Sequence, residues 1–260
     1  MPAKRYHSIN YRADIQGGDY PMHALHAPAL EKPQAGLPPI RIIAIPGTPS
    51  RDYVFYRFLA RAPADLEVTM VTRAGYGGDS YGEGVHEPVL SFEDQVKAIA
   101  PLFEKDDGKR TLIFGVSYGG ALSLKCALDY PDYIDAVMTV AMLVHEPRAY
   151  VRGSVKLGGV PGINHALPQY LKNARREVIA RRAQIKPLFE KLKTIHQPVT
   201  ILHGNRDNLV PLSAAKDLQS YFSADQDVRF QLIKNGTHYL ECERPNLLYK
   251  ELDLLNERIA

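Results

Sequence analysis

The stretch TLIFGVSYGGALSLKCAL, residues 111–128, decides the fold class of this chain. It opens with four residues typical of a buried strand, Thr111–Phe114, and ends in a run whose apolar residues recur at helical spacing. Between the two parts, glycines flank Ser117 on both sides. A strand that turns directly into a helix is a building unit of a parallel sheet covered by helices, so this stretch predicts an α/β fold.

The same alternation of strands and helices extends along most of the chain. Two extended segments come first, near residues 5–14 and 21–27. The predicted strands that follow are 41–45, 66–72, 111–114, 135–143, 199–203 and 228–233, and the predicted helices are 53–61, 91–105, 118–130, 213–222 and 245–259. This order predicts a mostly parallel, eight-stranded sheet with helices on both faces. Such sheets bind ligands at the carboxyl ends of their strands.

Ser117 stands at the apex of the predicted strand-to-helix turn. Gly115 and Gly119 permit the crowded backbone that such a sharp turn requires, and the pattern Gly-x-Ser-x-Gly is that of a nucleophile elbow. The turn also leaves backbone N–H groups free at the start of the helix, where negative charge is favoured. Taken alone, the pattern also fits a serine that only caps a helix.

A serine hydroxyl becomes a strong nucleophile when a histidine takes its proton and a carboxylate orients that histidine. His238 follows the last predicted strand, in NGTHY, and Asp207 follows the strand before it, in GNRDNLVP. The order Ser117, Asp207, His238 fits a doubly wound hydrolase. Glu146, which follows the strand at 135–143, is a rival candidate for the orienting acid.

Four matching stretches resemble the α/β-hydrolase superfamily of esterases, lipases and peptidases. They are the loop at Gly47, the turn at 73–77, the elbow at 115–119, and the acid and histidine loops together. The resemblance covers the chain from about Ile40 to the C-terminus. It implies that Ser117 is the nucleophile, His238 the general base and acid, and Asp207 the residue that orients the histidine.

The same resemblance implies an oxyanion hole with two backbone donors. One is the N–H of Tyr118, directly after the nucleophile. The other is the N–H of Thr48, in Pro46-Gly47-Thr48-Pro49, since Pro49 has none. The family usually has a histidine where this chain has Pro46, so the bracing of the loop differs from the family pattern.

Residues 71–77, VTRAGYG, resemble the family's Asp-Arg-Pro-Gly-Tyr-Gly loop, with Thr72 and Ala74 in place of the aspartate and the proline. The resemblance implies a structural role for this loop. The glycine-rich segment 75–84 lacks the last glycine of a dinucleotide fingerprint and the Lys-Ser/Thr pair of a phosphate-binding loop. It therefore does not predict a nucleotide cofactor.

Residues 144–197 break the alternation, because they contain a Gly/Pro-rich part and a basic helical run, LKNARREVIARRAQIK, but no convincing strand. We expect this segment to be a cap inserted into a core formed by residues 1–143 and 198–260. The basic run is interpreted as a solvated helix face rather than a site for anions or membranes. The apolar cap residues Leu157–Ile163, Tyr150, Tyr170 and Phe189 either line a substrate pocket or form the cap's own core, which we favour.

Composition narrows the possible partners. The 260 residues are 45% hydrophobic and 23% charged, and the net charge of +3 gives no argument for nucleic acid. The sequence has no apolar stretch long enough to span a membrane, and its N-terminus lacks the apolar core of a signal peptide. We therefore expect a cytoplasmic protein. Cys126 and Cys242 form no paired motif, so we expect no zinc site. We expect no metal and no cofactor, because no partners at metal-ligand spacing accompany His145, His165, His196 and His203. Cys126 is expected to pack as a small apolar residue.

These features predict a serine hydrolase that cleaves a carboxylic ester of a small molecule through an acyl-enzyme, as a monomer or a homodimer. Lactonase, thioesterase, C–C bond hydrolase and aminopeptidase activities remain alternatives, because the same triad serves them all. A ligand-binding receptor that keeps the triad but turns over little is an alternative of a different class.

Overall fold

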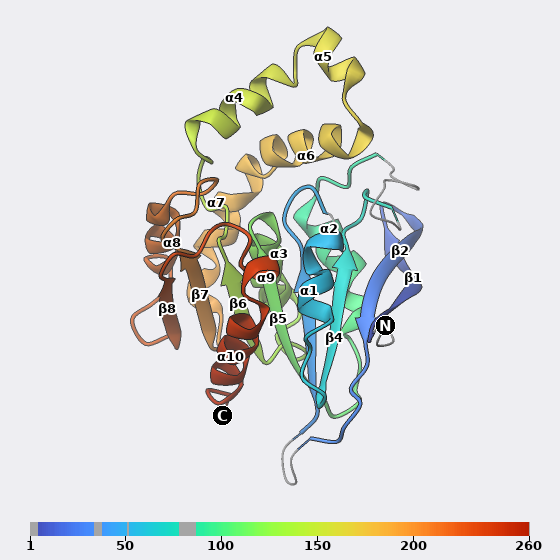
Figure 1. Ribbon diagram of the computed structural model, residues 1–260, viewed down its shortest axis with the longest axis vertical. Helices are drawn as coiled ribbons and strands as arrows, with labels where there is room; N and C mark the ends of the chain where they lie inside the picture. The colour runs from blue at the N-terminus through green and yellow to red at the C-terminus, as the bar shows by residue number, and fades with distance from the viewer. Residues whose placement is uncertain (1–4, 34–37, 51, 78–86, 260) are drawn as a thin grey trace.

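The computed structural model describes residues 5–33, 38–50, 52–77 and 87–259. Its central feature is an eight-stranded sheet with the order β1-β2-β4-β3-β5-β6-β7-β8 (Figure 1). The strands are β1 (His7–Ile15), β2 (Gly18–Ala27), β3 (Ile40–Ile45), β4 (Leu66–Thr72), β5 (Arg110–Val116), β6 (Ala136–Val140), β7 (Val199–Gly204) and β8 (Val228–Ile233). Strands β3 to β8 pair in parallel, whereas β2 pairs antiparallel with both β1 and β4. The predicted mostly parallel, eight-stranded sheet is confirmed.

Helices cover both faces of the sheet, because its central strands are apolar on both sides. In β3, Ile43 and Ile45 join one buried cluster and Ile42 and Ala44 join the other, as the alternation of side chains along a strand requires. Cys126 is buried in the first cluster, so its predicted apolar packing is confirmed.

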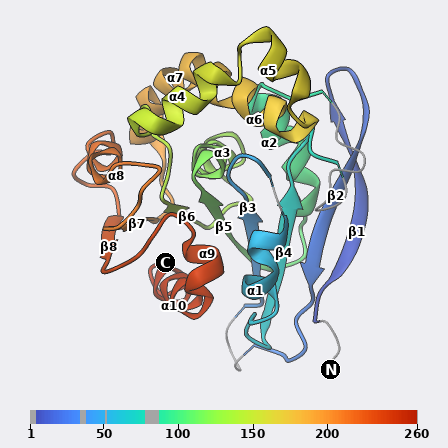
Figure 2. The same ribbon diagram turned by 45° about the horizontal axis from the view of Figure 1, so that its top comes forward.

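The two layers of helices lie on opposite sides of the sheet in Figure 2. The first buried cluster includes side chains of α2 (Phe92–Ile99), α3 (Tyr118–Asp129), α7 (Arg182–Glu190) and α8 (Leu212–Gln219). The second includes side chains of α1 (Tyr56–Leu59), α9 (Leu240–Glu243) and α10 (Pro245–Asn256). Short 3-10 turns η1 (Asp52–Phe55), η2 (Ala100–Leu102) and η3 (Leu192–Thr194) adjoin α1, α2 and α7.

Two predicted elements are shorter than expected. The side chain of Ser91 caps α2 by accepting a hydrogen bond from the Asp94 N–H at 3.2 Å, as its position predicts. The α-helix ends at Ile99, before Pro101, which has no N–H to continue the helical hydrogen bonds. Strand β6 ends at Val140, because the next residue, Ala141, has a positive φ of 48° that breaks the extended backbone.

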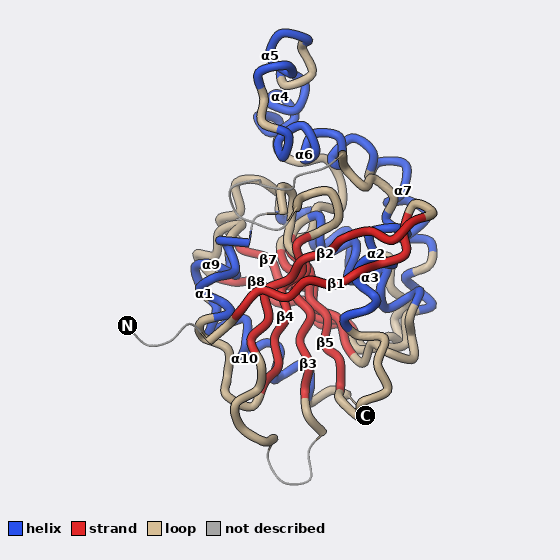
Figure 3. Tube along the Cα trace, turned by 90° about the vertical axis from the view of Figure 1, so that its right-hand side faces the viewer, coloured by secondary structure: helices blue, strands red, loops and turns tan. Residues whose placement is uncertain are grey.

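The segment 144–197, all of which is described, contains no strand. Its helices are α4 (Ala149–Leu157), α5 (Pro161–Ala166), α6 (Gln169–Ala180) and α7, and the first three stand above the carboxyl ends of the strands (Figure 3). Neither α4 nor α5 has a buried residue, whereas α7 packs in the same apolar cluster as α3. A cap at 144–197 on a core of 1–143 and 198–260 stays a proposal. Among the described residues, no helix combines the length and apolar character needed to cross a membrane.

Candidate active site

Ser117 lies in a strained turn between β5 and α3, with φ of 55° and ψ of −114°. Only glycine fits at positions 115 and 119, because neighbouring backbone atoms leave no room for a Cβ. A Cβ on Gly115 would lie 2.0 Å from the carbonyl oxygen of Gly119, and a Cβ on Gly119 would lie 2.3 Å from that of Ile45. The turn therefore has the tight geometry predicted from the Gly-x-Ser-x-Gly pattern.

Asp207 and His238 lie in the loops after β7 and β8, and their side chains meet. The Nδ1 of His238 is 2.7 Å from Oδ2 of Asp207, and both residues are buried. The other carboxylate oxygen, Oδ1, accepts hydrogen bonds from the N–H groups of Leu209 and Val210, each at 2.8 Å. Burial raises the pKa of Asp207, but the hydrogen bonds and charge of its partners outweigh burial and lower that pKa below its ordinary value. The carboxyl group is therefore ionised at neutral pH.

Ser117 and His238 line one cavity of about 120 Å³ at the carboxyl edge of the sheet. The structure thus brings Ser117, Asp207 and His238 together, as the order of their loops predicts. Among the described residues, no hydrogen bond joins the Ser117 hydroxyl to His238. Such contacts often tighten only in a substrate complex.

Glu146, the rival acid, is held elsewhere. Its two carboxylate oxygens accept hydrogen bonds from Arg182 of α7 at 2.8 and 2.9 Å. The partner of His238 in the structure is Asp207.

The loop that contains Thr48 lies directly against Ser117, since a Cβ on Gly47 would be 3.0 Å from the Cβ of Ser117. Among the described residues, no group accepts a hydrogen bond from the N–H of Thr48 or of Tyr118. Arg73 braces this loop, donating from Nε to the Pro46 carbonyl at 3.1 Å and from Nη2 to the Gly47 carbonyl at 2.9 Å. A guanidinium therefore supports the loop in which Pro46 replaces the family's histidine.

Arg73 is itself paired with a residue that the sequence did not single out, Glu177 of α6. The guanidinium donates from Nη1 and Nη2 to the two carboxylate oxygens, at 2.5 and 2.9 Å. Burial lowers the pKa of Arg73, but the carboxylate beside it outweighs burial and raises that pKa above its ordinary value. The pair is a fully buried salt bridge between the cap segment and the loops below it.

A model of the alpha/beta hydrolase family matches residues 42–249, which is most of the chain. The chain belongs to this family. Comparison with the sequences of curated proteins gave no match.

Solved structures of other α/β-hydrolases resemble this one in fold. A peroxisomal α/β-hydrolase of Saccharomyces cerevisiae has a TM-score of 0.69 at 14% identity, covering 97% of this chain and 88% of its own. A naproxen esterase of Bacillus subtilis has a TM-score of 0.65 at 16% identity, covering 96% and 92%. A haloalkane dehalogenase of Agrobacterium tumefaciens C58 has a TM-score of 0.69 at 16% identity, covering 97% of each chain. At these identities the likeness shows the fold alone.

A larger hollow of this α/β-hydrolase, about 390 Å³, lies in the cap segment and shares Thr48 and Pro49 with the Ser117 cavity. Its other walls come from α4, α5 and α6 and the turns between them, and they are mostly apolar: Val151, Ser154, Val155, Leu157, Gly158, Ile163, Leu167, Leu171, Ala174, Arg175 and Val178. Leu157 and Ile163 thus line a pocket, so the interpretation that they form the cap's own core is wrong. Phe189 does pack in the core, whereas Tyr150 is exposed.

The basic run of the cap is only partly a solvated face. Arg181 is 2% exposed and donates to the carbonyls of Val144 and His145, at 3.2 and 2.6 Å. The interpretation as a solvated face is wrong at this residue, because the chain turns inward between α6 and α7. Sequence periodicity carries no signal for such a turn.

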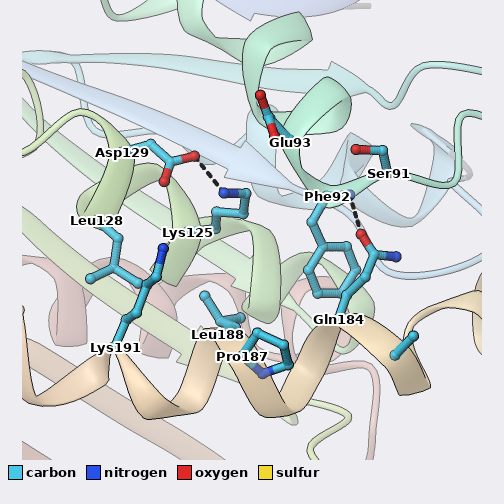
Figure 4. A pocket seen from close by; sticks show the side chains of 11 residues that line it. Ser91, Phe92, Glu93, Lys125, Leu128, Asp129, Gln184, Pro187, Leu188 and Lys191 are labelled. Atoms are coloured by element: carbon cyan, nitrogen blue, oxygen red, sulfur yellow. Dashed lines mark hydrogen bonds and ion pairs between the residues drawn. The ribbon is translucent and has the colours of Figure 1, made fainter.

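A third cavity, about 260 Å³, lies between α2, α3 and α7 (Figure 4). Gln184 of α7 lines it, accepting a hydrogen bond from the Phe92 N–H at 2.6 Å and donating to the Leu90 carbonyl at 2.9 Å. None of the predicted catalytic or oxyanion residues lines this cavity. The two hydrogen bonds of Gln184 attach α7, at the end of the cap segment, to the core.

Glu241, in α9, is a second residue of the candidate site that no sequence pattern predicted. It is 2% exposed, it is among the lining residues of the Ser117 cavity, and its Oε2 has no hydrogen-bond partner among the described residues. Burial, with a smaller contribution from the negative charges of Glu243 and Asp207, raises the pKa of Glu241 to about 8. The active-site cavity therefore holds a carboxyl group that is mostly protonated at neutral pH.

Proposed function

We propose that this α/β-hydrolase cleaves a carboxylic ester of a small molecule through a Ser-His-Asp triad and an acyl-enzyme. The observation that carries the proposal is the buried hydrogen bond between Asp207 and His238, beside the cavity that the strained Ser117 also lines. This is the arrangement needed for a base to act on a serine hydroxyl.

In the proposed reaction, His238 takes the proton of Ser117 as the hydroxyl oxygen attacks the ester carbonyl. The N–H groups of Thr48 and Tyr118 stabilise the oxyanion that forms. His238 then protonates the leaving alcohol, and later activates a water molecule that releases the acid and regenerates Ser117. Asp207 holds the imidazole with its Nδ1–H directed away from the serine, so Nε2 is the nitrogen that exchanges protons.

The hollow in the cap supports an ester with an apolar part of medium length. Its walls are mostly apolar, and it meets the Ser117 cavity at Thr48 and Pro49, beside the proposed oxyanion donors. Burying each CH₂ of a substrate chain there would contribute about 0.8 kcal/mol. We also propose that the protein acts in the cytoplasm as a monomer or a homodimer, without a metal or an organic cofactor.

Two measurements test the proposal. Purified protein should hydrolyse p-nitrophenyl esters, with rates that rise from acetate towards hexanoate, and Ser117→Ala should abolish the activity. A fluorophosphonate should label the wild-type chain at Ser117. Hydrolysis by Ser117→Ala at the wild-type rate would overturn the assignment, and an unlabelled Ser117 in a chain that binds esters tightly would favour the receptor alternative.

The panel also separates the alternatives within the fold. Lactones, aryl thioesters and aminoacyl anilides should be assayed beside the esters at equal concentration. A kcat/KM at least tenfold higher for one of them than for every ester would replace the ester assignment but leave the triad in place.

A further inference from the structure

Glu177 of α6 collects hydrogen bonds from two loops of the core. Besides the two from Arg73, its Oε2 accepts one from the Tyr76 hydroxyl at 2.7 Å and one from Oγ1 of Thr48 at 2.5 Å. Glu177 has no exposed surface, and all of these donors come from outside the cap segment. One carboxylate of the cap therefore holds residues of the 46–49 loop and the 73–77 loop at once.

The link from Glu177 reaches the peptide group proposed to stabilise the oxyanion. Arg73 donates to the Gly47 carbonyl, and that carbonyl belongs to the same peptide unit as the Thr48 N–H. A trans peptide is planar, with its C=O and N–H pointing in opposite directions. A hydrogen bond that fixes the carbonyl therefore also fixes the direction of the N–H, and it polarises that N–H as a donor.

Arg73 also touches the second proposed donor residue. Its guanidinium carbon lies 4.6 Å from the ring centre of Tyr118 and 5.0 Å from that of Tyr76. Because Arg73 is buried, its position depends on a partner for its charge, and that partner is Glu177. Without the carboxylate, the guanidinium would be drawn towards water and away from the Gly47 carbonyl.

We propose that Glu177 is a positioning residue: when α6 is seated on the core, Glu177 fixes Arg73 and Thr48, and the oxyanion site of Thr48 and Tyr118 is complete only then. This inference rests on the proposed ester hydrolysis. It makes the cap a part of the catalytic geometry in addition to a wall of the substrate pocket.

Other contacts are sufficient to attach the cap segment to the core. Asn173, one turn before Glu177 on α6, donates to the Gly75 carbonyl at 2.9 Å. Arg181 donates to the carbonyl of Leu143, the last core residue before the cap, at 3.5 Å, and Gln184 bonds to the backbone of Phe92 and Leu90. None of these three contacts touches residues 46–49, so the Glu177 network differs from them in reaching the nucleophile's loop.

The first test is Glu177→Gln, assayed with p-nitrophenyl esters for kcat and KM and by thermal unfolding. The amide keeps the size of the side chain but loses its charge, so the hold on Arg73 weakens. We expect kcat to fall by about 10²–10³, the range for losing one oxyanion donor, with KM changed by less than about threefold. The matched control is Glu146→Gln, which removes an ion pair with Arg182 that is remote from the 46–49 loop and should leave kcat within about twofold. A Glu177→Gln enzyme with wild-type kcat overturns the proposal.

The second test is the double variant Arg73→Met/Glu177→Met, which replaces the buried pair by apolar side chains of similar length. Such replacements commonly keep or restore stability. If the pair only attaches the cap, this variant should regain both the wild-type Tm and the wild-type kcat, which would overturn the proposal even if Glu177→Gln fails to fold. We expect a wild-type Tm with kcat still reduced by about 10² or more. Failure of the ester assignment itself would appear separately, as a wild-type chain that neither hydrolyses esters nor labels at Ser117.

Discussion

Asp207 uses its two carboxylate oxygens for two different contacts, with Oδ2 2.7 Å from Nδ1 of His238 and Oδ1 bound to the N–H of Leu209 and of Val210. The backbone contacts fix the plane of the carboxylate, so the imidazole has one favourable orientation. The same three hydrogen bonds keep the carboxyl group ionised despite its burial.

Asp207→Asn should keep the fold and lose activity. An asparagine amide can satisfy one set of contacts but favours the wrong tautomer of His238, so we expect kcat for ester hydrolysis to fall by about 10⁴. The measurement is steady-state kinetics beside a thermal melt. The control is Glu146→Gln, since Glu146 is the rival acid and is bound to Arg182. A larger loss in Glu146→Gln than in Asp207→Asn would exchange the roles of the two acids.

Ser117→Gly should be more stable than Ser117→Ala, although we expect both to be inactive. The positive φ of residue 117 strains any residue with a Cβ, at a cost of about 1–3 kcal/mol. Glycine relieves that strain. However, it loses more conformational freedom on folding than alanine, which lowers the free energy of unfolding by about 0.5–1 kcal/mol. Because the relief of strain is larger than this cost, urea unfolding should give Ser117→Gly a free energy of unfolding about 1 kcal/mol higher than that of Ser117→Ala. Equal stability of the two variants would show that the turn is relaxed.

Glu241→Gln should change how stability depends on pH. The folded-state pKa of Glu241 is raised from the ordinary value of 4.5 to about 8, so the folded protein binds a proton that the unfolded chain releases in this range. Stability from this group is therefore full below pH 4.5 and is lost as the pH rises to about 8. Each pKa unit corresponds to about 1.4 kcal/mol, so the total loss should be a few kcal/mol.

The measurement is the free energy of unfolding at several pH values between 5 and 8.5. Glu241→Gln should show a flatter dependence than the wild type and should be the more stable of the two at pH 8.5. Glu190→Gln, a change of the same kind at an exposed site on α7, should keep the wild-type slope. The expectation fails if the slope of Glu241→Gln equals that of the wild type.

Ala174→Phe should shorten the ester chain that the enzyme prefers. The new ring would fill part of the apolar hollow in the cap, while the Ser117 cavity stays open. Losing the burial of three CH₂ groups corresponds to about 2.4 kcal/mol, so the ratio of kcat/KM for hexanoate over that for propanoate should fall by roughly 50-fold. Ala166→Phe, the same change at an exposed position of α5 outside the hollow, is the control. An unchanged chain-length profile in Ala174→Phe would place the substrate chain elsewhere.

The residues that the sequence made predictable are those at strand ends. Ser117, Asp207 and His238 each follow an apolar strand, and parallel strands bring their carboxyl ends to one edge, so their order in the chain was enough to expect them together. Glu177 gave no such signal, because it lies within a basic helix and its partners are about 100 or more residues away. Only tertiary packing determines that this face of α6 is buried.

The cap is a second place where sequence alone was not enough to predict the packing of side chains. Leu157 and Ile163 have the apolar character of core residues, and the sequence therefore favoured a core. In the structure, neither α4 nor α5 has a buried residue, and their apolar side chains border a hollow instead. Hydrophobicity predicts that such side chains avoid water, but it does not distinguish a packed neighbour from a ligand.

The order of the proposed catalytic loops along the chain also bears on how the protein is made. A ribosome releases the Thr48 loop and Ser117 first, then the cap helix that carries Glu177, and only afterwards Asp207 and His238. While β7 and β8 are still being synthesised, Ser117 has neither its proposed base nor its proposed orienting acid. By the proposed mechanism, the nascent chain therefore gains its hydrolytic activity only after its last strand joins the sheet.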